Sequence, residues 1–284
     1  MNNIILRAQN LSKKYGRIEA VRNAAFSLPE GKITAFLGEN GAGKTTTLKL
    51  LLGFLRPDSG RVETGDWRIG YVPERPVFFN WLKGKEIIAL TAKMHGIEKQ
   101  DLPLKIENLS GKISFDRKLL ERKVQTYSLG NQKKFSYLQS LLISPDLLIV
   151  DEPFTALDPP SIKSIRDLFC GLKREGRTVF LSSHLVSEVE KICDEIIIIS
   201  KGDIIIQEDL NRLKNDHVFV RFEKAALDKE KLSALCSRVK EEDTGFVMLI
   251  EKRRLDSLAD YLGSKELLSH EQPDLEKIFL FFIQ

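Results

Sequence analysis

The chain has 284 residues, of which 42% are hydrophobic and 30% are charged, a composition typical of globular proteins. Its formal net charge of +4 is spread over many residues of both signs and is too weak to indicate nucleic-acid binding, so we expect no nucleic-acid partner. No apolar run approaches the ~18 residues that span a bilayer, so a membrane role would require a separate protein.

The first chemical motif is Gly38–Thr45, which reads G-E-N-G-A-G-K-T and fits the phosphate-loop pattern G-x-x-x-x-G-K-[ST]. A β-rich run precedes it, and a stretch with helical apolar spacing follows it. Glycines allow backbone N–H groups to turn toward phosphate oxygens, and the start of the helix adds its positive dipole end. Lys44 can then reach the β- and γ-phosphates of a nucleotide, while the Thr45 hydroxyl can hold Mg²⁺.

The next two segments do not indicate a function by their residues alone. The segment "IGYVPERP" contains Glu74, and "YSLGNQKKF" begins a helix that Ser128 can cap. Lys133 and Lys134 of the second segment are predicted to lie on a solvated helix face rather than at a nucleotide.

The segment "DLLIVDEP" carries the second strong motif. Its apolar run, Leu147–Val150, is typical of a parallel strand that is covered on both faces. Asp151 and Glu152 follow at the carboxyl end of that strand, where open α/β sheets place their ligands. Asp151 therefore fits a Mg²⁺-organising role, and Glu152 fits a base that polarises an attacking water.

A further strand-like segment, "TVFLSSHL", ends near His184. Strand-like runs alternate with helical stretches, which predicts an α/β core. These runs are Ile33–Leu37, Leu147–Val150, Val179–Ser182 and Ile196–Ile199. From about residue 212 the pattern changes to alternating strands and amphipathic helices, so we expect a small C-terminal α+β accessory domain.

The order of these motifs resembles that of the ATP-binding subunit of ABC transporters, over most of residues 3–210. Tyr15 of "LSKKYG" matches the aromatic residue that stacks on adenine in this family. Glu74 stands in the Q-loop, where glutamine is usual and helps to hold Mg²⁺. Ser128 and Gly130 match the family signature LSGGQ, from which the residues at 129 and 131 depart.

The resemblance also implies a set of site residues. His184 matches the histidine that contacts the γ-phosphate and orients water, and Asp158 of "TALDPPS" matches the D-loop at a subunit boundary. The predicted catalytic residues are Lys44, Glu152 and His184. The nucleotide is predicted to be bound by Tyr15, Gly38, Asn40, Gly41, Gly43, Lys44, Thr45, Thr46, Glu74, Ser128, Gly130 and Asp158, and Mg²⁺ by Thr45, Asp151 and Glu74.

In architecture, the resemblance implies a P-loop NTPase core of class α/β at residues 1–211, with a helical subdomain at about 77–140, followed by the accessory domain at 212–284. Two ATPase subunits, most simply two copies of this chain, would sandwich ATP head to tail and drive a separate transmembrane permease, most simply an exporter. We therefore expect a cytoplasmic protein, held at the inner face of the membrane by its permease, with ATP and Mg²⁺ as cofactors.

Two questions stay open at this level. A soluble single-cassette ATPase, for example one in iron–sulfur assembly, would carry the same ATP site without a permease. The aromatic residues Phe78, Phe79 and Trp81 follow the Glu74 loop, where the family receives its membrane subunit, but they fit a hydrophobic core equally well.

Overall fold

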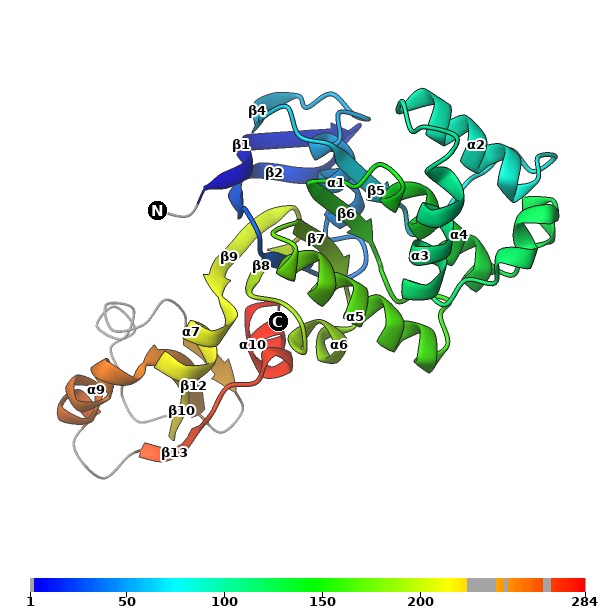
Figure 1. The fold of residues 1–284 in the computed structure, drawn as a ribbon. Helices are drawn as coiled ribbons and strands as arrows, with labels where there is room; N and C mark the ends of the chain where they lie inside the picture. Colours follow the sequence, from blue (N-terminus) through cyan, green and yellow to red (C-terminus); the bar gives the residue numbers. More distant parts are fainter. Residues whose placement is uncertain (1–2, 224–238, 243–244, 263–266, 284) are drawn as a thin grey trace. The chain divides into compact units, whose positions relative to one another are not determined.

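The computed structural model describes residues 3–223, 239–242, 245–262 and 267–283, and the chain divides into two compact units, Met1–Gln207 and Glu208–Gln284 (Figure 1). The remaining residues of the predicted accessory domain, 224–238, 243–244, 263–266 and 284, lie outside the described residues. Across the described part of the chain, no helix combines the length and the apolar character needed to cross a bilayer.

The first unit is built on a six-stranded sheet with the strand order β5-β6-β7-β3-β8-β9. Neighbours among β5, β6, β7, β3 and β8 pair in parallel. The strands are β3 (Ile33–Leu37), β5 (Ile69–Val72), β6 (Leu147–Asp151), β7 (Thr178–Ser183), β8 (Glu195–Ser200) and β9 (Asp203–Asp209). All four apolar runs that predicted strands lie in this sheet, which confirms the α/β core.

A smaller antiparallel sheet, with the order β2-β1-β4, lies in the same unit. Its strands are β1 (Ile4–Tyr15), β2 (Ile18–Pro29) and β4 (Ser59–Thr64). Phe26 of this sheet packs against Phe36 and Phe180 of the larger one, with ring centroids 5.8 and 6.0 Å apart. The main hydrophobic core therefore fills the space between the two sheets.

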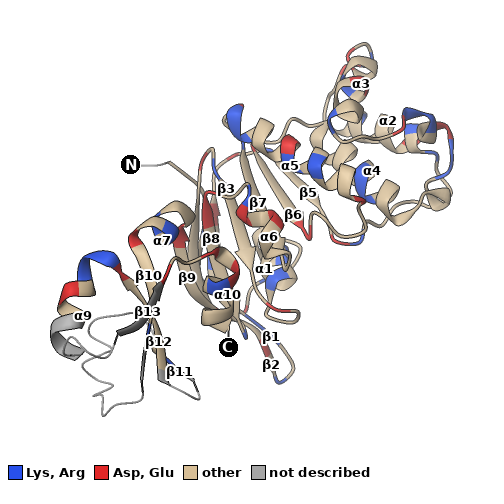
Figure 2. Ribbon diagram, turned by 90° about the horizontal axis from the view of Figure 1, so that it is seen from below, with Lys and Arg blue, Asp and Glu red and all other residues tan. Residues whose placement is uncertain are grey.

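Helices complete the first unit: α1 (Lys44–Leu51), α2 (Gly84–Met94), α3 (Leu102–Lys112), α4 (Leu129–Leu141), α5 (Pro159–Arg174) and α6 (Val186–Glu190), with 3₁₀ turns at Arg117–Glu121 and Val124–Thr126. Figure 1 shows α2, α3 and α4 gathered at one side of this unit. Charged residues lie mainly on the helices and loops, whereas β3 and β7 carry none (Figure 2). These two strands therefore pass uncharged through the centre of the sheet.

The second unit is a four-stranded antiparallel sheet with the order β11-β12-β10-β13. Its elements are α7 (Leu210–Asp216), β10 (His217–Glu223), β11 (Val239–Glu242), β12 (Gly245–Glu251), a 3₁₀ turn at Lys252–Arg254, α9 (Leu255–Leu262), β13 (Leu267–Glu271) and α10 (Leu275–Ile283). One face of the sheet packs on Leu258 of α9, and on the other face Phe219 stacks against Phe281 of α10, 5.4 Å between centroids. Both amphipathic helices that the sequence predicts here are thus present.

Candidate functional site

The backbone of the loop from β3 to α1 lies close to the backbone of β2. Gly43, at the N-cap of α1, has φ of 106°, a value that side chains rarely allow. A Cβ atom at Gly43 would lie 2.2 Å from the Ala20 carbonyl oxygen, so this position requires glycine. Because Ala20 belongs to β2, the same contact fixes the loop against the smaller sheet.

Lys44 starts α1 and points its buried side chain back across this loop. Its ammonium donates to the carbonyl oxygens of Gly38, at 2.7 Å, and Glu39, at 3.2 Å. The same Nζ lies 3.7 Å from Oε1 of Glu152. An ammonium that bonds only to main-chain carbonyl oxygens among these contacts can exchange them for the oxygens of a phosphate that enters the loop.

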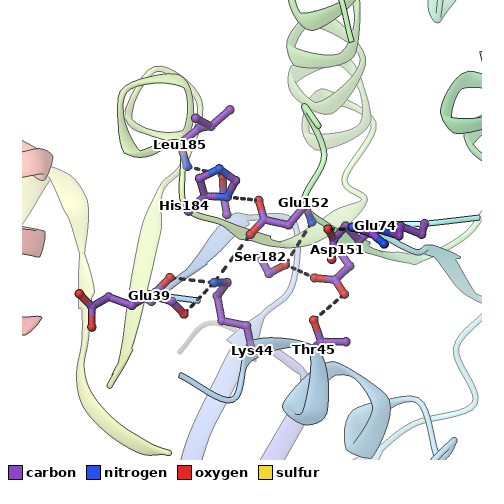
Figure 3. A network of polar contacts seen from close by, with 12 residues as sticks. Glu39, Lys44, Thr45, Glu74, Asp151, Glu152, Ser182, His184 and Leu185 are labelled. Carbon is purple, nitrogen blue, oxygen red and sulfur yellow. Dashed lines mark hydrogen bonds and ion pairs between the residues drawn. The ribbon is translucent and has the colours of Figure 1, made fainter. Parts of the chain in front are cut away.

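Asp151 is almost fully buried and is held from two neighbouring elements (Figure 3). The Thr45 hydroxyl donates to its Oδ2 at 2.9 Å, and the Ser182 hydroxyl donates to its Oδ1 at 2.5 Å. The contacts arise because β6, β7 and β3 are adjacent in the sheet, so their carboxyl ends meet at one edge. Sequence reasoning missed Ser182; its position at the end of an apolar strand was the available signal.

Glu152 follows with φ of 48°, a left-handed conformation that is uncommon outside glycine. Its backbone N–H is held by the hydroxyl and carbonyl oxygens of Ser182, at 3.2 and 3.1 Å. Its side-chain Oε2 lies 2.8 Å from Nδ1 of His184 (Figure 3). Backbone strain of this kind concentrates at functional sites. Here it turns the carboxylate toward both Lys44 and His184.

These residues surround a pocket of about 370 Å³, a volume in the usual range for small-molecule sites. Nine predicted site residues line it: Asn40, Gly41, Gly43, Lys44, Thr45, Thr46, Glu74, Glu152 and His184. Ala20 and Thr155, which are not among the predicted site residues, line it as well. The polar groups thus converge on one cavity from the edge of the larger sheet, from the start of α1 and from the Glu74 loop.

Other predicted residues do not line this pocket. Asp151 and Gly38 contact it from behind, through Thr45 and Lys44. Ser128 and Asp158 are exposed elsewhere on the first unit. Tyr15, 48% exposed at the end of β1, is also absent from the lining, so its adenine role stays a prediction.

Ser128 forms the predicted N-cap of α4, since its hydroxyl accepts a bond from the backbone N–H of Asn131 at 3.3 Å. Gly130 in the first turn approaches the D-loop backbone: a Cβ there would lie 2.8 Å from the Ala156 carbonyl oxygen. The signature segment therefore begins a helix and contacts the segment after Glu152.

The prediction for Lys133 is wrong. Its side chain is only 1% exposed, and Nζ donates to the carbonyl oxygens of Pro73, at 2.8 Å, and Asp151, at 2.7 Å. Burial lowers the pKa of Lys133 to about 8, although nearby carboxylates, Asp151 foremost, act in the opposite direction. Lys134, by contrast, lies nearer the surface and donates to the Ser114 carbonyl oxygen at 3.1 Å.

The aromatic residues after Glu74 divide between the interior and the surface of the first unit. Phe78 is half-buried and meets the buried Phe135 edge to face, with ring centroids 5.1 Å apart, so it packs against the core. Phe79 and Trp81 stack on each other at 5.4 Å but remain 55% and 67% exposed. Val77 beside them is 92% exposed, so an apolar surface lies next to the Glu74 loop.

Comparison with known proteins identifies the family to which this chain is similar. A family model described as "ABC transporter" matches residues 21–155. The lantibiotic transport ATP-binding protein SrtF of Streptococcus pyogenes is 35% identical over 219 residues, which cover 74% of this chain and 93% of SrtF. The bacitracin transport ATP-binding protein BcrA of Bacillus licheniformis is 35% identical over 222 residues, or 74% of this chain and 71% of BcrA.

A solved structure of an ATP-binding subunit of an ABC transporter superposes with a TM-score of 0.67 at 26% identity, over 74% of this chain and 92% of that one. The likeness agrees with the meeting of the phosphate loop, the end of the Asp151–Glu152 strand and His184 at one pocket. The chain therefore belongs to the family of ABC transporter ATP-binding proteins.

Proposed function

We propose that this chain hydrolyses Mg-ATP in the pocket around Lys44 and thereby energises a separate membrane permease that exports its substrate. The observation that carries the proposal is the convergence of Lys44, Glu152 and His184 on one cavity next to the phosphate loop. A structural turn would need none of the three side chains in that place.

Phosphate binding rests on the loop. When ATP enters, Lys44 exchanges its bonds to the Gly38 and Glu39 carbonyl oxygens for oxygens of the β- and γ-phosphates. The N–H groups at the start of α1 add the positive end of the helix dipole. Both interactions strengthen as negative charge develops on the β-phosphate of the leaving ADP, which is how they accelerate the reaction.

Water activation is assigned to Glu152. Its Oε2 contacts His184, while Oε1 faces Lys44, so the carboxylate is held in one orientation beside the phosphate position. Glu152 accepts a hydrogen bond from the attacking water, and His184 fixes the carboxylate and approaches the γ-phosphate. The exclusion of bulk water would be completed by a second subunit.

The residues fit a Mg²⁺ ion bound together with the nucleotide. Mg²⁺ prefers hard oxygen donors and is held by one or two carboxylates together with substrate phosphates. The Thr45 hydroxyl lines the pocket and lies 2.9 Å from the Asp151 carboxylate behind it. Glu74, from the loop after β5, lines the same pocket. Once bound, the ion would neutralise charge between the β- and γ-phosphates.

A head-to-tail homodimer accounts for the residues that do not reach their own pocket. Ser128 and Asp158 are exposed on the first unit, away from the phosphate loop that lies in the same chain. In a sandwich, Ser128 and Gly130 of one subunit would face the γ-phosphate held by the other. ATP would then join the subunits, and its hydrolysis would release them.

Export through a permease is supported by the relatives and by the surface. SrtF and BcrA are named for lantibiotic and bacitracin transport. The exposed patch formed by Val77, Phe79 and Trp81 follows the Glu74 loop directly, so a protein bound there could respond to the state of the nucleotide. We assign this patch to the permease contact.

The test is a pull-down of tagged Glu152→Gln chain from detergent-solubilised native membranes in the presence of Mg-ATP. A polytopic membrane protein recovered in stoichiometric amount is the expected result. Recovery from the soluble fraction alone, together with assembly proteins, would instead favour a soluble ATPase such as one of iron–sulfur assembly.

Replacement of Trp81 by aspartate is expected to remove most of the permease from this pull-down, at least about tenfold, because a charge in a buried apolar contact is costly. Leu104→Asp is the matched control, since Leu104 is also exposed, at 63%, but lies on α3. Thermal denaturation of both variants checks that they fold. Equal permease recovery by Trp81→Asp and wild type would contradict the assigned surface.

A further inference from the structure

The buried ammonium of Lys133 joins the two segments from which the carboxylates of the pocket project. It donates to the carbonyl oxygen of Pro73, the residue before Glu74, and to that of Asp151, the residue before Glu152. These two segments lie far apart in the sequence, at either side of the helices α2 to α4. A single side chain thus fixes the separation of the backbones that carry Glu74 and Glu152.

Two further donors on the same face of α4 extend this connection. Tyr137 and Ser140 follow Lys133 at positions i+4 and i+7, which place them along one face of a helix. The Tyr137 hydroxyl donates to the Pro153 carbonyl oxygen at 3.1 Å, and the Ser140 hydroxyl donates to that of Tyr71 at 2.6 Å. The helix is therefore fastened to the strand end of β6 and to the end of β5 at several points.

Lys133 differs from these hydroxyls in charge and in the number of segments it binds. A lysine is rarely buried to 1% exposure, because the ammonium loses its hydration. Here the lost hydration is offset by two carbonyl oxygens and by the nearby carboxylates of Asp151, Glu152 and Glu74. The cation therefore also opposes the repulsion among carboxylates that the pocket gathers.

We propose that Lys133 is a positioning residue for ATP hydrolysis: its ammonium holds the Glu74 loop against the Glu152 strand end, so that both carboxylates address the same nucleotide. The inference rests on the proposed function. It predicts an effect on the chemical step rather than on ATP binding, because Lys133 itself does not line the pocket.

The experiment compares Lys133→Met, Lys133→Gln and Lys134→Met with the wild type in steady-state ATP hydrolysis. Methionine keeps the unbranched side chain as far as Cε but supplies no donor. We expect kcat to fall about 10- to 100-fold in Lys133→Met, with KM for ATP within about twofold, because small displacements of catalytic groups have effects of this size. Lys133→Gln, whose amide offers two donors, is expected to recover much of that loss.

Lys134→Met is the matched control, since Lys134 is the next residue on α4 and bonds only at the surface; its kcat should stay within about twofold of wild type. The Lys133→Met effect is also measured in a Glu74→Gln background. If the ammonium acts partly on Glu74, the loss in kcat there should be at least about threefold smaller than in the wild-type background.

Melting temperatures separate positioning from simple folding support. A lower melting temperature with wild-type kcat per folded molecule would overturn the proposal, and so would fully additive effects of the two substitutions together with no recovery in Lys133→Gln. If Lys133→Met does not fold, Lys133→Gln and its Glu74→Gln double variant decide the same question. A wild-type chain without turnover both alone and with its permease would overturn the proposed function, and this inference with it.

Discussion

Replacement of Lys44 by alanine is expected to reduce ATP hydrolysis at least ~100-fold, the usual effect of removing a preorganised group that stabilises transition-state charge. The buried ammonium of Lys44 lies between the phosphate loop and Glu152, where no neighbouring cation among the described pocket residues can replace it. The measurement is phosphate release at saturating Mg-ATP with purified protein, or with the permease complex if the isolated chain is inactive.

Lys49→Ala is the control for this substitution. Lys49 lies in the last turn of the same helix but is exposed, so its removal should leave the rate within about twofold. Both variants should unfold at temperatures close to that of the wild type. Turnover in Lys44→Ala within tenfold of wild type would mean that the loop between β3 and α1 does not bind the reacting phosphates.

The second substitution with a large expected effect is Glu152→Gln. The variant should lose ATP hydrolysis but still bind ATP. Glutamine keeps the shape of the side chain but cannot act as a base toward water, so the γ-phosphate persists and the sandwich does not reopen. The loss of the negative charge 3.7 Å from Lys44 also leaves that ammonium more available to phosphate. We expect a stable dimer in Mg-ATP and a monomer in Mg-ADP, measured by light scattering after size exclusion.

A double variant, Glu152→Gln with Ser128→Arg, tests whether that dimer is the proposed sandwich. A bulky side chain at exposed Ser128 would clash with a nucleotide bound by the opposite subunit, so the double variant should remain monomeric in Mg-ATP. A dimer that survives Ser128→Arg would have to form through another surface. A Glu152→Gln chain that stays monomeric even with its permease present would argue against the sandwich itself.

Much of the fold was accessible from the sequence because its signals are local. Apolar runs such as Leu147–Val150 indicated buried parallel strands, and acidic residues after them marked the carboxyl edge of the sheet. The phosphate loop was equally clear, since its glycines and Lys44 stand at fixed spacing. These features depend on neighbours within a few residues, which a single chain displays directly.

The burial of Lys133 was not accessible in the same way. The partners of its ammonium are main-chain carbonyl oxygens at Pro73 and Asp151, and every residue has such a carbonyl, so no side-chain pattern announces the contact. Next to Lys134, it looked like one of two solvated charges. Ser182 is a similar case, because the partner of its hydroxyl, Asp151, lies on the neighbouring strand and is far away in the sequence.

The order of strands in the larger sheet has a consequence for synthesis on the ribosome. The strand before the phosphate loop, β3, pairs with β7 and β8, which are translated long after it. An emerging chain therefore carries its Gly-rich loop with an unpaired strand, one that is wholly buried in the folded protein, until residues 178–200 have left the exit tunnel. We expect that ATP does not stabilise the chain at this stage, because His184, the last residue in chain order to line its pocket, has not yet left the ribosome. We expect nascent chains stalled before β7 to depend on chaperones and to gain nucleotide binding only once that strand has been released.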